Sequence, residues 1–94
     1  MKILVWDNSF RRAFKRLVRK QPSLQDKVLA ALALLEEDPF TPSLKSHKLK
    51  GNLDGLWSCW VEYDCRIIFT LETEAETNEE LIVLIDIGSH DEVY

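Results

Sequence analysis

The feature that most restricts the fold is an unbroken alternation of side chains between residues 57 and 71. Residues of one parity are apolar or aromatic, whereas those of the other are mostly polar. Successive side chains of a β-strand point to opposite faces, so this pattern predicts β structure with one buried face. Because the segment is long for one strand and Glu62, Tyr63 and Asp64 suit a turn, we expect two antiparallel strands hinged there. The predicted buried parity consists of Trp57, Cys59, Val61, Tyr63, Cys65, Ile67, Phe69 and Leu71.

Two amphipathic helices are expected before this region. Residues 2–6 form a short apolar run that predicts a strand, and residues 7–9 suit a strand end followed by a helix N-cap. Apolar side chains then recur at helical spacing until a proline ends the first helix. Ser23 and Asp26 are spaced almost as in a capping box, which predicts a second helix from there to about Glu37.

The remaining segments complete the order of elements. Residues 38–55 predict a basic loop that can include a short extended piece, and residues 72–80, with five glutamates, predict a solvated hairpin tip. The run LIVLIDI at residues 81–87 predicts a central strand buried on both faces. The predicted order is therefore β-α-α-β-β-β. This is an α+β fold in which two N-terminal helices pack on one face of a small, mainly antiparallel sheet.

Length and hydropathy narrow the class further. With 94 residues, the chain is expected to form one domain spanning residues 1–94. The longest nearly uncharged apolar stretch, residues 28–35, is far shorter than the roughly 20 residues that cross a bilayer, and residues 1–10 lack a signal-peptide core. We therefore expect a cytoplasmic protein with no membrane partner.

Charge is distributed unevenly along the chain. The net charge is −4, yet residues 11–50 carry ten Lys or Arg against four acids, whereas residues 51–94 carry one against eleven. Local field steers a polyanion more than net charge does, so an acidic chain of this kind can still present a basic face to phosphate. The alternative is an ordinary solvated helix face.

No metal or cofactor site is expected. Cys59 and Cys65 lack zinc-type spacing and are best explained as small buried hydrophobic residues, with a disulfide or redox pair as the alternative. His47 and His90 are the two histidines, and nothing in their spacing resembles a metal motif. Both lie outside the periodic segments, where a scaffold often displays catalytic groups.

Four side chains could together cleave RNA without a metal. Asp64 and Arg66 project from the same strand face if no bulge intervenes, although a surface ion pair is the commoner explanation for such neighbours. Cleavage by the RNA 2′-hydroxyl needs a base, a cation for the phosphorane charge and an acid for the leaving 5′-oxygen. His47, Asp64, Arg66 and His90 supply that set. Trp60, on the same parity, is either a platform for an unstacked base or a packing residue.

Three segments resemble the RelE/ParE superfamily of bacterial toxins. They are residues 47–58 (HKLKGNLDGLWS), residues 62–69 (EYDCRIIF) and residues 87–94 (IGSHDEVY). The third segment and the HKLKG loop are most similar to YafQ-like and RelE/StbE-type messenger-RNA interferases, and the element order agrees over essentially the whole chain. The resemblance implies a ribosome-dependent endoribonuclease that cuts messenger RNA in the A site and is inhibited by a cognate antitoxin protein.

The resemblance also implies roles for single residues. His47 matches the loop histidine, Asp64 the acid after the second strand, and His90 the histidine before the C-terminus, while Arg66 matches an arginine that stabilises the transition state. Tyr94 matches a terminal aromatic near the substrate base. YafQ-like toxins carry an acid where Ser58 stands and a histidine where Trp60 stands, so the general base can be either His47 or Asp64.

Our leading hypothesis is therefore metal-free cleavage in which His90 protonates the 5′-oxygen. Arg66 would stabilise the phosphate with lysines of the basic loop, and the basic helix would contact ribosomal RNA. Operator DNA would be bound only through the antitoxin complex, and no cofactor is implied. The alternatives are a ParE-like inhibitor of DNA gyrase and an inactive toxin-fold binding module. The lysines are Lys45, Lys48 and Lys50, and the helix residues are Arg11, Arg12, Lys15, Arg16 and Arg19.

Overall fold

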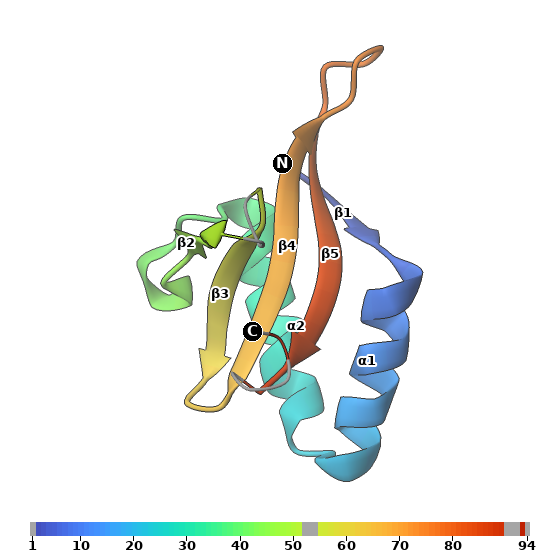
Figure 1. Ribbon diagram of the computed structural model, residues 1–94, viewed down its shortest axis with the longest axis vertical. Coiled ribbons are helices and arrows are strands. Elements are labelled where there is room, and N and C mark those ends of the chain that lie inside the picture. The colour runs from blue at the N-terminus through green and yellow to red at the C-terminus, as the bar shows by residue number, and fades with distance from the viewer. Residues whose placement is uncertain (1, 52–54, 90–92, 94) are drawn as a thin grey trace.

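The computed structural model of the chain describes residues 2–51, 55–89 and 93 and has a mixed five-stranded sheet with two helices in these residues (Figure 1). The strand order is β1-β5-β4-β3-β2, in which β1 pairs parallel with β5 and the other neighbours are antiparallel. This confirms the predicted α+β fold. The elements are β1 (Ile3–Trp6), α1 (Asn8–Lys20), α2 (Leu24–Glu37), the 3-10 helix η1 (Pro42–Leu44), β2 (His47–Lys48), β3 (Trp57–Glu62), β4 (Cys65–Thr73) and β5 (Glu80–Gly88).

The alternating segment forms the β3–β4 hairpin, with its turn at Tyr63 and Asp64 as predicted. The apolar parity faces the helices and contributes the sheet side of the core, including the fully buried Ile67 and Phe69. Tyr63 is the exception, because its place in the turn leaves it 89% exposed. The register shifts between Trp60 and Glu62, so a bulge precedes the turn.

Strand β5 differs from the prediction that it is buried on both faces. Ile82 and Leu84 are buried on the helix side, whereas Leu81, Val83 and Ile85 keep intermediate exposure. The difference arises because α1 and α2 both pack on one side of the sheet (Figure 1). Apolar content alone does not distinguish a strand covered on one face from a strand covered on both.

Helix α1 is fixed to the sheet at its first turn. The Asp7 carboxylate accepts a hydrogen bond from the Ser9 amide, with Asp7 Oδ2 and Ser9 N 3.2 Å apart, and so caps the helix as predicted. Ser9 Oγ lies 2.6 Å from Asp7 Oδ2 and 2.6 Å from the carbonyl oxygen of Ile85. The N-terminus of α1 is therefore held beside β5, just past the point where β1 ends its pairing at Leu84.

The capping box predicted for α2 is wrong. Ser23 has helical backbone angles, with φ −65° and ψ −16°, and its side chain makes no capping hydrogen bond. An N-cap residue typically has an extended backbone, whereas Ser23 lies in a turn with helical angles. The backbone amides of Leu24 and Gln25 instead donate to the carbonyl oxygens of Gln21 and Pro22.

The expectations for the hairpin tip and for the burial of the two cysteines are confirmed. Strands β4 and β5 are joined by a projecting tip at residues 74–79, in which Asn78 adopts a left-handed φ of 61° (Figure 1). Cys59 and Cys65 are both buried, and burial raises the pKa of Cys59 to about 12. Among the described residues, no helix is long and apolar enough to cross a bilayer.

The Asp7 cap predicts a pH-dependent contribution to stability. Hydrogen bonds from the Ser9 hydroxyl and the Ser9 amide lower the pKa of Asp7 from its ordinary value of 3.8. Because the folded-state pKa is the lower one, the charged cap stabilises the protein above the unfolded-state pKa, and this contribution disappears as pH falls through the folded-state pKa. Asp7→Ala should lower the free energy of unfolding at pH 7, whereas Asp7→Asn, which still caps, should lower it less.

Urea denaturation at pH 7 and pH 3 measures both effects. The difference between wild type and Asp7→Asn should narrow at pH 3, because this pH lies below the ordinary pKa of 3.8, where the unfolded chain takes up the proton and the contribution of the charge begins to disappear. An equal difference at both pH values would contradict the role of the charge.

Candidate functional site

A cleft of about 510 Å³ opens between α1 and the end of the sheet that carries the β3–β4 turn. It exists because β1 pairs with β5 only as far as Leu84, so the rest of β5 faces α1. The pairing of Arg66 with Gly88 brings the turn beside the end of β5. The charged residues of the lining are Arg16 and Lys20 from α1, Asp64 from the turn and Asp86 from β5, and the lining also includes Gln21, Gly88 and Ser89.

Two carboxylates line this cleft in different environments. Asp64 is exposed in the turn, and no hydrogen bond engages its side chain within the described residues. Asp86 has intermediate exposure, and its Oδ1 accepts a hydrogen bond from the Ile87 amide at 2.8 Å. Asp64 is therefore the carboxylate available to a ligand, whereas Asp86 is bound to the backbone beside it.

Asp86 and Lys20 were not among the residues predicted from the sequence. Asp86 is the single acid within the apolar run at residues 81–87, and an acid in such a run is costly unless it is paired or used. Lys20 follows Arg16 by four residues, which places both on one face of α1. The first signal could have identified Asp86 from the sequence, and the second could have identified Lys20.

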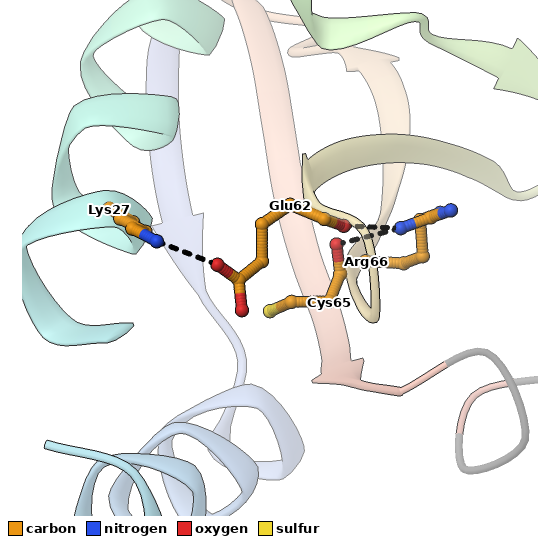
Figure 2. Close-up of polar contacts among 4 residues, drawn as sticks. All are labelled: Lys27, Glu62, Cys65 and Arg66. Carbon is orange, nitrogen blue, oxygen red and sulfur yellow. Dashed lines mark hydrogen bonds and ion pairs between the residues drawn. The ribbon is translucent and has the colours of Figure 1, made fainter. Parts of the chain in front are cut away.

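Arg66 closes the turn that carries Asp64. Its Nη1 donates to the carbonyl oxygens of Glu62 at 2.6 Å, Tyr63 at 3.0 Å and Cys65 at 3.2 Å, and Figure 2 shows the first and last of these. Asp64 and Arg66 do not project side by side from one regular strand, because Asp64 lies in the turn and β4 begins only at Cys65. Arg66 instead points at the backbone of the turn.

The same turn is tied to α2 by an ion pair. Lys27 Nζ lies 2.8 Å from Glu62 Oε2, and both side chains are partly exposed (Figure 2). This contact and the Arg66 hydrogen bonds hold the last residues of β3 from two sides. The position of Asp64 is thus set by neighbours on β4 and α2.

The predicted residues of the basic loop lie at the other end of β3. His47 is exposed in β2, opposite Ser58, and its Nδ1 is 3.1 Å from the Lys45 carbonyl oxygen. Ser58 and Glu62 are four residues apart on β3, which corresponds to roughly 13 Å along a strand. His47 is absent from the lining of the cleft, so the two candidate bases are not brought together.

Trp60 is partly buried and covered by a cation. Lys45 Nζ lies 5.0 Å from the centroid of the Trp60 ring, which also lines an apolar groove of about 250 Å³ with Leu34 and Leu44. Lys48 makes a similar contact, with its Nζ 5.6 Å from the Trp57 ring. Lys50 is exposed. Trp60 therefore packs in the groove and also contacts the basic loop, because Lys45 lies over its ring.

The basic residues of α1 divide into two groups. Arg11, Arg12, Lys15, Arg16 and Arg19 are all exposed, as predicted, and only Arg16 of these lines the cleft. His90 and Tyr94 lie outside the described residues. Within those residues, no group of three or more His, Cys, Asp or Glu side chains is arranged to hold a metal ion.

Comparison with known proteins identifies relatives. A model of the family described as the YafQ bacterial toxin of type II toxin–antitoxin systems matches residues 2–94. No curated protein matches at a significant level. Among solved structures, YafQ from E. coli strain BL21(DE3) is 20% identical, with a TM-score of 0.80, and the match covers 100% of this chain and 99% of that chain.

Two further structures have the same fold. A YoeB/ParE toxin from Agrobacterium tumefaciens is 23% identical, with a TM-score of 0.75 and coverage of 96% of this chain and 99% of that one. The E. coli DinJ–YafQ toxin–antitoxin complex contains a chain that is 19% identical, with a TM-score of 0.73 and coverage of 99% and 97%. At these identities the structural likeness shows the fold alone.

The contacts of Arg66 predict a measurable stabilisation of the turn. Arg66→Ala removes a charged donor from three carbonyl oxygens, so we expect the free energy of unfolding to fall by about 2 kcal/mol. Lys27→Ala is the matched control, because it removes a cation of α2 that contacts the same turn but breaks only an exposed ion pair, worth at most about 1 kcal/mol. Urea denaturation measures both, and an equal loss in the two variants would contradict the capping role.

Proposed function

The chain belongs to the YafQ family of bacterial toxins of type II toxin–antitoxin systems, and on this basis we propose that it is a ribosome-dependent endoribonuclease that cleaves messenger RNA and inhibits translation. One observation supports the chemistry most directly. Asp64 shares a cleft with Gly88 and Ser89, and His90 is the next residue in the chain. On this proposal, a carboxylate and a histidine that are distant in the sequence act on one substrate.

The proposed reaction uses the RNA 2′-hydroxyl as the nucleophile. A base removes the proton of the 2′-hydroxyl, the 2′-oxygen attacks the adjacent phosphorus, and an acid protonates the 5′-oxygen as its bond to phosphorus breaks. We assign the base to Asp64 and the acid to His90. Asp64 is favoured over His47 because it lines the cleft and its carboxylate is not engaged, whereas His47 lies at the far end of β3.

Arg66 has a positioning role in this proposal. Its Nη1 donates hydrogen bonds to the carbonyl oxygens of the turn. Arg66 therefore affects the reaction indirectly, by holding Asp64 in position. The basic loop and its neighbouring ring would bind RNA on either side of the cleaved bond, and Tyr94 would lie near the substrate base by family resemblance. These residues of the loop region are His47, Lys45, Lys48, Lys50 and Trp60.

We further propose two kinds of macromolecular partner. The exposed cations on the outer side of α1 would contact ribosomal RNA, and such binding should weaken as salt rises. A cognate antitoxin would inhibit the protein, as the DinJ–YafQ toxin–antitoxin complex suggests for a relative, and operator DNA would be bound only through that complex. Both partners are consistent with action in the cytoplasm.

Primer extension in a bacterial translation extract tests the proposal. Wild-type protein should produce cuts at in-frame codons that require ribosomes. His90→Ala should abolish the cuts, and Asp64→Asn should slow them by at least about 100-fold, the usual effect of losing a general acid or base. Asp26→Asn, a matched change on the exposed side of α2, should cleave like wild type.

Other outcomes would redirect the assignment. Wild-type cleavage by both His90→Ala and Asp64→Asn would contradict the proposed acid and base. Intact RNA with growth arrest would favour a ParE-like action on DNA gyrase. Intact RNA without toxicity would favour an inactive binding module on the same fold, because fold alone does not determine activity.

A further inference from the structure

We infer that Arg16 and Lys20 hold the phosphate of the cleaved RNA, so that the substrate backbone enters between α1 and the β3–β4 turn. This inference rests on the proposed nuclease function and names the cations that act at the scissile bond. It separates Arg16 and Lys20 from the other cations of α1, which remain assigned to ribosomal RNA. Arg66 donates its hydrogen bonds to the backbone of the turn, so Arg16 and Lys20 take the role of the cations that bind the phosphate.

The placement of the two cations follows from helix geometry. Arg16 and Lys20 are four residues apart, so they lie one above the other on the same face of α1. Ala13 and Leu17, the buried residues of the neighbouring turns, hold this face against the sheet. Both cations thereby line the cleft opposite the carboxylate that we assign as the base, Asp64.

The two cations are available to a ligand. Ion pairs in the described part of the chain join Lys2 to Glu80 and Lys27 to Glu62, and neither Arg16 nor Lys20 is paired with a carboxylate there. A guanidinium and an ammonium that share one concave wall can bind two oxygens of a phosphate, with the guanidinium able to bind in a bidentate manner.

The carboxylates make the cleft selective among anions. Asp64 and Asp86 balance the two cations, so the formal charge of this lining is zero. A multiply charged free anion would be attracted to one wall and repelled by the other. A phosphodiester carries a single charge, and the adjacent ribose offers a hydroxyl donor to an acceptor such as the free carboxylate of Asp64. The pattern of charge therefore suits a ribose phosphodiester.

The chain offers a closely matched control for this inference. Lys15 and Arg19 are also one lysine and one arginine, four residues apart and exposed on α1, but neither lines the cleft. Removing either pair changes the net charge equally. A difference between the pairs therefore reports position and not total charge.

The experiment measures binding without ribosomes. The probe is an RNA tetranucleotide with every ribose 2′-O-methylated, so that it cannot be cleaved, titrated into ¹⁵N-labelled protein and followed by amide chemical shifts. Wild type should show saturable shifts at Gly88 and Ser89. Arg16→Ala/Lys20→Ala should weaken the affinity by about tenfold or more, whereas Lys15→Ala/Arg19→Ala should weaken it by less than about threefold. Unchanged melting temperatures would show that both double variants fold.

Each result has one meaning. Equal weakening by the two double variants, or no saturable shift in wild type at millimolar probe, would overturn the inference. Primer extension with the wild-type protein separates the inference from the nuclease proposal. Intact messenger RNA together with selective loss of probe binding would reject the nuclease and support the phosphate site. Cleavage of messenger RNA with equal weakening would support the nuclease and reject the site.

Discussion

The antiparallel pairing of β4 with β5 is the interaction on which the rest of the structure depends. It runs from Arg66 and Gly88 at one end to Thr73 and Glu80 at the other, and it places Phe69 and Leu84 together in the core. A slip of one residue would turn the buried set of a strand toward the open face, so burial on one face specifies this register strongly. The same register carries the β3–β4 turn to the end of β5. The cleft is thus a consequence of the pairing that builds the core.

The other wall of the cleft depends on how α1 is held. The Asp7 cap and the contact of Ser9 with the Ile85 carbonyl oxygen fix the first turn of α1 beside β5. Apolar residues of the later turns then dock against the sheet, which leaves Arg16 and Lys20 facing the turn. The turn is held in place by Arg66. Local polar contacts at both walls therefore set the distance across which a ligand would bind.

How far the sequence predicted this arrangement depended on the kind of interaction involved. Strict alternation predicted β3, β4 and their turn, because strand periodicity is a local property that one buried face enforces. The open side of β5 and the backbone angles of Ser23 were mispredicted, since both depend on neighbours from other parts of the chain. The sequence did not predict whether a bulge interrupts the hairpin, and the bulge before Glu62 likewise depends on tertiary contacts.

The candidate site residues show the same difference between features that the local sequence determines and features that depend on the fold. Asp64 could be singled out because it stands in a polar interruption of an apolar pattern, and the structure adds that it faces a cleft. Arg66 was predicted as a phosphate ligand from the chemistry of RNA cleavage and from the resemblance, but its donor contacts with backbone carbonyls are visible only in three dimensions. The partnership of Lys20 with Arg16 follows from helix spacing, yet its relation to Asp64 requires the register of β4 and β5. The chemistry of a single side chain can be read from the sequence, whereas which side chains lie close together depends on the fold.

The acidic net charge of the chain does not oppose an RNA-binding role. Most of the glutamates of residues 72–80 lie in or beside the projecting tip, at the end of the sheet opposite the β3–β4 turn (Figure 1). The nine residues of β4 separate the two ends by about 30 Å. This is several times the Debye length of about 8 Å at physiological salt, so the tip contributes little to the potential at the cleft. Charge separated in this way would also favour approach of a polyanion by the α1 side, because the tip repels it while the cations of α1 attract it.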